Sequence, residues 1–478
     1  MTAAASPFAY MTAVEMAQRI RAREISSLAV TTEILRRAEQ SQPTLNAFIT
    51  LCKDEALAAA KAADAAVARG DTLGPLHGVP VSVKDIINTA GIRTTWASRT
   101  MQNNVPDMDA AAVKRLKDAG AVIIGKTMTS EFAHKLMTDA PAFGVTRNPW
   151  GLAYTPGGSS GGSAVAVAAG LGPLSLATDA GASTRLPAAC TGIVGLKPTL
   201  GVIPHNQVPD GFNNFIHLGV MARTVRDAAL MLDVVAGPHP ADPHSLGLNH
   251  IRATASLDTP IKGLRIAFRP LIGNTLLDDE VRAACEASLA AFRALGATVD
   301  VIDEAIDNAE PAWRILQQSN WAARFFARID EVAPQLDPSF VDGIRAGGAY
   351  SGQQLLQATY KRTAHFRMVQ GWFATYDLIL TPTMSRPPLS ADHKALDPIA
   401  INGQDAGDMR ASWVPYLNMF DLTGHPAVSV PCGVSRDGLP LGLQIVGPWY
   451  ADAKVLAAAL AFETAQPWAQ RIPPHAVA

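Results

Sequence analysis

The chain has 478 residues, with 40 Lys and Arg against 42 Asp and Glu and a net charge of −2. A chain of this length corresponds to roughly three domain-sized units, or to one large core with an insertion, which excludes a small disulfide-stapled scaffold. The near-neutral charge argues against nucleic acid or an anionic membrane as a partner, because either one selects a basic face. Small neutral molecules are therefore the expected ligands.

The four cysteines, Cys52, Cys190, Cys285 and Cys432, lie far apart and form no CxxC pair. This spacing predicts neither a disulfide framework nor a zinc site, and it fits a reducing cytoplasm. The start of the chain has no cationic stretch leading into an apolar run, and no run of about 18 apolar residues occurs elsewhere. We therefore expect a soluble, cytoplasmic protein without a membrane segment or a metal.

The elements of the first 125 residues change in periodicity along the chain. Apolar residues at helical spacing predict a helix over 12–23, Ser26 or Ser27 is a candidate cap for the next helix, and the alanine-rich stretch 54–69 predicts another. We expect residues 1–70 to be helices that pack outside a larger core. Strands are expected at 79–83 and 120–125, with an amphipathic helix at 110–119 between them. Strand, helix and strand in this order predict an α/β fold with parallel pairs.

The second half of the chain predicts an insertion followed by a return to the core. Residues 237–263 are rich in Pro, His, Asp and Ser, which is typical of a linker, and residues 279–375 are mostly of helical type. Strands are then expected at 377–381, 427–431 and 441–446, before a final helix at 453–465. The predicted segments are 1–70 (N-terminal helices), 71–237 (core), 238–395 (linker and helical cap) and 396–478 (return to the core).

Glycine is concentrated in one part of the chain. Residues 157–201 hold 10 of the 37 glycines, and the only charged residues there are Asp179, Arg185 and Lys197. A glycine-rich and charge-poor segment with several serines indicates backbone folded tightly inside a core, where backbone N–H groups and serine hydroxyls are the available polar groups.

The opening of this segment, Pro156-Gly-Gly-Ser-Ser-Gly-Gly-Ser163, leaves several hypotheses open. A phosphate-binding loop is disfavoured because the terminal Lys-Ser/Thr pair is missing. Ser160 also satisfies the G-x-S-x-G pattern of an α/β-hydrolase nucleophile, which needs a downstream histidine such as His365, His393 or His425. A flexible linker is disfavoured because a buried type of helix follows directly.

Three separated motifs in family order resemble the amidase signature family. They are GVPVSVKDI at 78–86, PGGSSGGSAVAVAAG at 156–170 and TDAGASTRLPAACTGIVGLKPT at 178–199. With further similar stretches, the resemblance covers about two thirds of the chain and is absent mainly within 238–420. The resemblance implies an α/β/α sandwich around a large mixed sheet that contains many parallel pairs, with a helical N-terminal segment and a helical insertion.

The resemblance implies a Ser-Ser-Lys triad, with Ser183 as nucleophile, Ser159 after a cis peptide as proton bridge, and Lys84 as base. A serine hydroxyl needs a neighbouring base, and a lysine serves as one only if desolvation lowers its pKa from about 10.4 towards 7. Lys84 meets this requirement because it continues the apolar strand that ends at Val83.

The N–H groups of Ala180, Gly181, Ala182 and Ser183 are then the expected oxyanion hole. The chain departs from the family at Ala182, where a second glycine is usual. This methyl group costs roughly 1 to 2 kcal/mol if the position is left-handed and nothing otherwise. It is also a reason to expect a narrower pocket or a slower rate.

Other residues near the motifs have simpler expected roles. Asp179 and Arg185 are expected to form a buried ion pair, and Cys190 to be a packed apolar residue. The stretch after Gly-Lys-Thr makes Met128, Thr129 and Ala133 the expected substrate contacts, with Met128 standing where relatives tend to have Asn. Candidates for an aryl or acyl pocket, which ordinary core packing explains equally well, are Trp96, Met101, Phe132, Met137, Phe143, Phe212 and Phe215.

The function that the resemblance implies is a serine amidohydrolase of small-molecule amides, aryl acylamides, carbamates (urethanes) or esters, without metal or organic cofactor. The alternative is a glutamyl-tRNA amidotransferase A-like subunit, which shares the triad and works with partner chains. The near-neutral charge and the departures at Met128 and Ala182 count mildly against the alternative. The motifs choose neither the substrate nor the oligomeric state.

Overall fold

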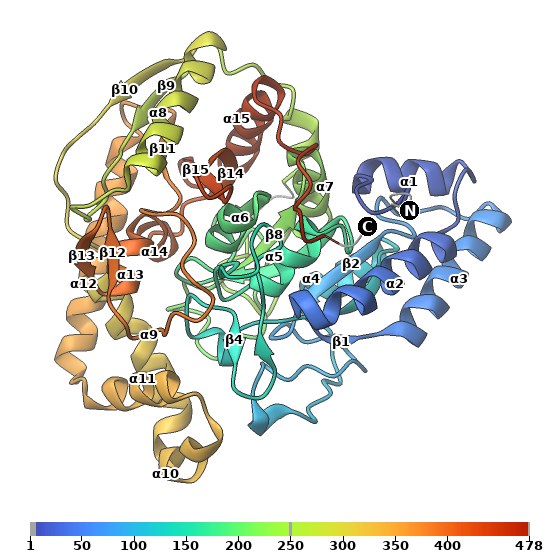
Figure 1. Ribbon diagram of the computed structural model, residues 1–478, viewed down its shortest axis with the longest axis horizontal. Coiled ribbons are helices and arrows are strands. Elements are labelled where there is room, and N and C mark those ends of the chain that lie inside the picture. Colours follow the sequence, from blue (N-terminus) through green and yellow to red (C-terminus); the bar gives the residue numbers. More distant parts are fainter. Residues whose placement is uncertain (1–5, 248–250, 477–478) are drawn as a thin grey trace.

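The computed structural model describes residues 6–247 and 251–476. Residues 1–5, part of the start where no targeting segment is expected, and residues 248–250 of the expected linker lie outside this range. The chain is built on one sheet of eleven strands, flanked by helices (Figure 1), so the expected α/β class with a mixed sheet is confirmed. In spatial order the strands are β1 Phe48–Leu51, β3 Val122–Thr127, β2 Pro80–Lys84, β6 Leu174–Asp179, β8 His217–Ala222, β7 Val194–Lys197, β14 Ala427–Val434, β15 Pro440–Val446, β11 Leu378–Pro382, β9 Arg265–Phe268 and β10 Thr298–Val301.

The strand β2 lies between β3 and β6 and runs parallel to both. All five of its residues are buried, as is Val79 just before it, which explains why Val79, Val81 and Val83 are apolar. The expected helix between β2 and β3 is α4, Ala111–Asp118, so the predicted strand–helix–strand unit is confirmed. Because parallel strands end at the same edge of a sheet, the last residues of β2 and β6 come close together there.

The N-terminal segment is mostly helical, as expected. Its helices are α1 Ala13–Arg21, α2 Ser27–Leu45 and α3 Lys53–Arg69, and the Ser26 hydroxyl caps α2 by accepting a hydrogen bond from Ala29 N–H at 3.0 Å. The expectation of helices alone is wrong at β1, which pairs antiparallel with β3 at one edge of the sheet. This strand has four residues, too few to show a period in the sequence.

The region expected to be a linker and helical cap also contributes to the sheet. Its mostly helical character is confirmed, but β9 and β10 form the far edge of the main sheet, with β9 parallel to β11. One hydrophobic core contains residues from Met11 to Trp468 and so includes parts of all four predicted segments. The boundaries between these segments stay a prediction. The helices of this region are α8 Asp279–Ala294, α9 Glu310–Phe325, α10 Ile329–Val332, α11 Pro338–Ala349 and α12 Gly352–Trp372.

The remaining elements surround the glycine-rich segment and close the chain. Within the described part of the chain, no helix is long and apolar enough to cross a membrane. The remaining helices are α5 Gly161–Ala168, α6 Arg185–Thr191, α7 Val225–Val235, α13 Met409–Trp413, α14 Pro415–Leu422 and α15 Asp452–Ala465. The small elements are the strand pairs β4 Asp139–Ala140 with β5 Gly144–Val145 and β12 Ile399–Ile401 with β13 Gln404–Gly407, and the 3₁₀ turns η1 Arg99–Met101, η2 Glu131–Ala133, η3 Ala253–Ser256, η4 Phe326–Arg328 and η5 Ala333–Gln335.

Candidate active site

The three residues of the expected triad meet in one hydrogen-bonded chain. Lys84 ends β2, Ser159 lies just before α5, and Ser183 lies on the loop between β6 and α6. Lys84 Nζ is 2.7 Å from Ser159 Oγ, which is 3.0 Å from Ser183 Oγ. Lys84 and Ser159 are fully buried, whereas Ser183 is 8% exposed. Ser183, the residue expected to be the nucleophile, is therefore the most exposed of the three hydrogen-bonded groups.

The surroundings of Lys84 favour its neutral form. Besides Ser159, its Nζ donates only to Thr178 Oγ1, at 2.8 Å, and within the described residues no carboxylate pairs with it. Burial lowers the pKa of Lys84 to about 7, although the negative charge of Asp179 acts in the opposite direction. Thr178 was not singled out from the sequence, although it precedes Asp179 in the third motif.

The backbone at Ser159 also contacts the nucleophile. The Gly158–Ser159 peptide is cis, as the resemblance implies, and the Ser159 N–H donates to Ser183 Oγ at 3.1 Å. The Ser183 oxygen therefore has two donors on one side, a hydroxyl and a backbone N–H.

The loop that carries Ser183 is held by the buried carboxylate of Asp179. Its oxygens accept hydrogen bonds from the N–H groups of Ala182 at 2.7 Å, Thr184 at 3.1 Å and Arg185 at 3.2 Å. The expected ion pair with Arg185 is confirmed and is bidentate, at 2.8 and 3.1 Å. Burial raises the pKa of Asp179, but the Arg185 guanidinium outweighs this effect and holds the pKa well below its usual range.

Because its N–H is bound to Asp179, Ala182 does not offer a free donor to an oxyanion, which differs from the expected set. Within the part of the chain that the structure describes, no group accepts a hydrogen bond from the N–H of Ala180, Gly181 or Ser183. Ala182 has no positive φ, so its methyl group carries no left-handed strain, and it is fully buried in the core. The structure therefore offers three free N–H groups beside Ser183 Oγ.

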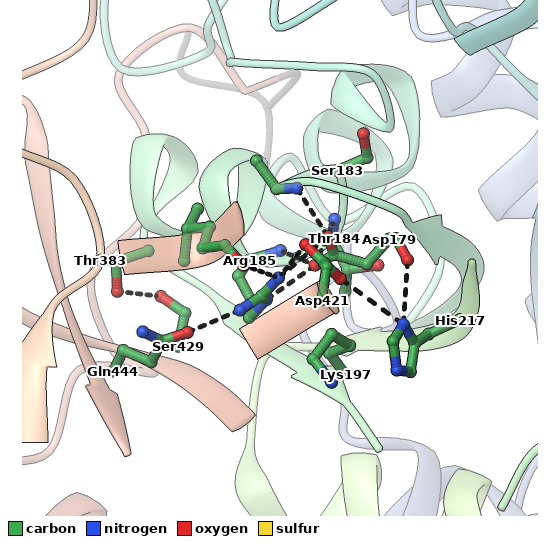
Figure 2. Close-up of polar contacts among 12 residues, drawn as sticks. Asp179, Ser183, Thr184, Arg185, Lys197, His217, Thr383, Asp421, Ser429 and Gln444 are labelled. Atoms are coloured by element: carbon green, nitrogen blue, oxygen red, sulfur yellow. Dashed lines mark hydrogen bonds and ion pairs between the residues drawn. The ribbon is translucent and has the colours of Figure 1, made fainter. Parts of the chain in front are cut away.

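Arg185 connects this loop to the C-terminal part of the chain, as Figure 2 shows. Its guanidinium also donates to Asp421 Oδ2 at 2.6 Å and to Gln444 Oε1 at 2.8 Å. Asp421 and Gln444 lie 236 and 259 residues further along the chain, in the stretch 421–447 that resembles the family, but neither was singled out from the sequence. The nucleophile loop is thus fixed to both halves of the sheet.

A cavity of about 310 Å³ opens above the triad. Ser159, Thr178, Ala180 and Ser183 form part of its lining, and Ala133 also lines it, as expected. Aromatic side chains form much of the remaining wall, and α9 and the 205–216 loop supply polar groups. The aromatic lining residues are Trp96, Phe132, Phe215 and Trp321, and the polar ones include His205, Gln207, Asn213, Asn214, Gln317, Asn320 and Arg324.

Two of the expected substrate contacts do not line this cavity. Met128 is fully buried against Ala97 and Ala140, and Thr129 is fully buried as well. They directly follow β3 and precede η2, so adjacency in sequence to Ala133 does not place them at the cavity. Of the expected apolar set, Trp96, Phe132 and Phe215 line the cavity, and Met101, Met137, Phe143 and Phe212 do not.

The Ser160 hypothesis is not supported by the geometry. Ser160 is fully buried and its hydroxyl donates to the Thr178 carbonyl at 3.3 Å rather than to a histidine. His425, one of its candidate partners, contacts Thr423 and Gln370 instead.

Comparison with known proteins agrees with these observations. The family model described as Amidase matches residues 29–456. An acylamidase from Rhodococcus erythropolis is 34% identical over 97% of each chain, and one of the subunits of the glutamyl-tRNA(Gln) amidotransferase of Geobacter metallireducens is 37% identical over 96% of this chain and 98% of its own. The crystal structure of a bacterial aryl acylamidase of the amidase signature family superposes with a TM-score of 0.91 at 29% identity, covering 97% of this chain and 98% of its own. The chain therefore belongs to the amidase family.

Proposed function

We propose that this amidase-family hydrolase cleaves carbon–nitrogen bonds of small-molecule amides through an acyl-enzyme on Ser183. The observation that carries the proposal is the continuous chain from Lys84 Nζ through Ser159 Oγ to Ser183 Oγ, with steps of 2.7 and 3.0 Å. Both distances are within the range of hydrogen bonds, so a proton can pass from the nucleophile Ser183 to the base Lys84.

Neutral Lys84 starts the reaction. Ser183 Oγ forms a bond with the carbonyl carbon while its proton passes to Ser159 Oγ, and Ser159 passes its own proton to Lys84 Nζ. The π electrons of the carbonyl move to its oxygen, and the free N–H groups of Ala180, Gly181 and Ser183 stabilise the negative charge. The hydroxyls reverse their donor direction as the proton moves, since each can rotate.

Charged Lys84 completes the first half-reaction. It returns a proton through Ser159 to the leaving nitrogen, the carbon–nitrogen bond breaks, and the acyl group stays on Ser183. A water molecule then attacks the ester along the same proton path, which releases a carboxylic acid and restores the hydroxyl of Ser183. These steps require no cofactor.

The wall of the cavity supports amides with an aryl or other apolar group. Trp96, Phe132 and Trp321 offer flat apolar surfaces, and such rings bury large areas at defined geometry. The acylamidase and aryl acylamidase among the similar proteins support the same substrate class. Carbamates and esters present a carbonyl to the same nucleophile, and their cleavage stays a prediction from the sequence. A cytoplasmic site of action is likewise a prediction from the sequence.

The test is hydrolysis of 4-nitroacetanilide by the purified chain alone, without ATP or any partner. Ser183→Ala should reduce the rate of hydrolysis by several orders of magnitude. The matched control is Ser160→Ala, one position after Ser159, and its rate should stay within about tenfold of wild type. Intact-mass detection of an acyl adduct in wild type, absent in Ser183→Ala, would locate the intermediate. Wild-type rates in Ser183→Ala would refute the mechanism, and strict dependence on a partner would favour the role of an amidotransferase component, which is that of the Geobacter relative.

A further inference from the structure

A tryptophan from outside the sequence motifs contacts the loop that carries the free N–H groups. Trp313, on α9, is 4% exposed, and its indole N–H donates to the Ala180 carbonyl at 2.5 Å. This residue follows Ala180 by 133 positions and lies in the segment where the sequence showed no motif.

The bond to the Ala180 carbonyl determines the direction of the next N–H group. The peptide that joins Ala180 to Gly181 is planar and trans, so its C=O and N–H point in opposite directions. Since the C=O faces the indole, the Gly181 N–H points away from Trp313. Ala180 and Ser183, which lie on either side of Gly181 in the sequence, line the catalytic cavity, and Trp313 does not.

Close packing holds the indole in this place. A Cβ atom on Gly181 would lie 2.8 Å from Trp313 Nε1 and Cε2, which only a glycine avoids. The guanidinium of Arg410 stacks on the ring, 3.9 Å from its centroid, and donates to the His134 carbonyl at 3.4 Å. Trp313 therefore has little freedom to move away from the loop.

We propose that Trp313 is a positioning residue that aims the Gly181 N–H at the oxyanion formed on the substrate. The loop then has two anchors: Asp179 binds the Ala182 N–H, and Trp313 binds the Ala180 carbonyl, so that the intervening Gly181 N–H stays free and directed. This inference rests on the proposed function, because it assumes that Ser183 attacks a carbonyl beside these N–H groups.

Trp313→Phe is the variant that tests the hydrogen bond, since it keeps an aromatic ring against Gly181 and removes the N–H donor. Losing an oxyanion donor outright reduces kcat by about 10²- to 10³-fold. Here the donor remains but loses its anchor, so kcat for 4-nitroacetanilide should fall by about 10- to 100-fold. KM should change by less than about twofold, because Trp313 does not line the substrate cavity.

The matched control is Trp468→Phe. Trp468 is also 4% exposed, and its indole N–H donates to a backbone carbonyl, that of Arg223, at 3.0 Å. Both variants lose one buried indole hydrogen bond and should lower the melting temperature to a similar extent. Only Trp313→Phe should lower kcat.

A second readout is inhibition by an aryl trifluoromethyl ketone. Ser183 Oγ adds to its carbonyl carbon, the carbonyl π electrons become an oxyanion, and the serine proton passes through Ser159 to Lys84. Trp313→Phe should weaken this ketone by the factor found for kcat, while the corresponding alcohol, which forms no oxyanion, should bind as to wild type. Titration with the ketone also counts folded sites, so kcat per titrated site stays measurable in a destabilised variant.

Unchanged kcat and unchanged ketone inhibition in Trp313→Phe would overturn the inference, as would an increase in KM alone or an equal loss of kcat in Trp468→Phe. These outcomes are distinct from a failure of the proposed function, which Ser183→Ala tests by itself. If Ser183→Ala is inactive and Trp313→Phe is fully active, only the role of Trp313 is refuted.

Discussion

Acidification should inactivate this enzyme through Lys84. The side chain is fully buried, and among the described residues its Nζ donates only to the hydroxyls of Ser159 and Thr178. Burial lowers its pKa from 10.5 to about 7. At about 1.36 kcal/mol per pH unit, the charged form is about 5 kcal/mol less favourable than in water. Only neutral Lys84 accepts the proton of Ser183, so activity should fall as pH falls below about 7.

The magnitude follows from the titration of a single group. Below a pKa of about 7 the neutral fraction drops tenfold per pH unit, so kcat/KM at pH 5 should be about 1% of its value at pH 9. The assay is kcat/KM for 4-nitroacetanilide from pH 5 to 9.5, because this substrate does not titrate in that range. Enzyme held at pH 5 and returned to pH 8 should recover full activity, which separates titration from unfolding.

A second buried lysine supplies the control. Burial also lowers the pKa of Lys197 to about 7, but its Nζ donates to the carbonyls of His425 and Pro198 and does not reach Ser159. Lys197→Met should therefore keep the acidic limb near pH 7. A flat profile down to pH 5, a limb near pH 10, or a limb that disappears in Lys197→Met would refute the assignment of Lys84 as the base.

Two further predictions concern the loop that carries Ser183. Arg185→Lys keeps the charge but loses the guanidinium that binds Asp179, Asp421 and Gln444. It should lower the free energy of unfolding by about 3 to 5 kcal/mol, because buried carboxylates are left poorly paired. A melting temperature equal to that of wild type would contradict this. Gly181→Ala places a methyl group 2.8 Å from Trp313 and should lower kcat at least tenfold, whereas the control Gly352→Ala, where a Cβ meets nothing within 4 Å, should be nearly neutral in kinetics and stability. Equal kcat in the two glycine variants would show that the close contact does not orient the loop.

Local features of the sequence predicted much of the fold. Alternating valines identified β2, apolar runs identified β3, β14 and β15, and helical spacing identified α1, α3 and α4. The short strands β1, β9 and β10 have four residues each, which is too few for a period to be read, and they become strands by pairing with partners far away in sequence. Propensity is a weak guide where such pairing decides the structure.

The substrate contacts show the same limit. Ala133 lines the cavity, whereas its near neighbours Met128 and Thr129 are fully buried and do not line it. A position a few residues from a motif is therefore no guide to which side chain meets a ligand. Trp313 carried no local signal, and Asp421 and Gln444 were not singled out although they lie in a stretch, 421–447, that resembles the family. Each of the three binds the nucleophile loop directly or through Arg185.

The sequence by itself determined which groups have suitable chemistry. It identified serines in a glycine-rich, charge-poor segment and a lysine at the end of an apolar strand, because residue type and immediate neighbours determine these properties. Only the tertiary structure decided that hydrogen bonds of 2.7 and 3.0 Å join Lys84 to Ser159 and Ser159 to Ser183, that Asp179 occupies the Ala182 N–H, and that an indole from α9 holds the Ala180 carbonyl. Hydrogen bonds depend on distance and direction in space, and here packing between segments 24 to 133 residues apart brings Lys84, Ser159, Ser183 and Trp313 together.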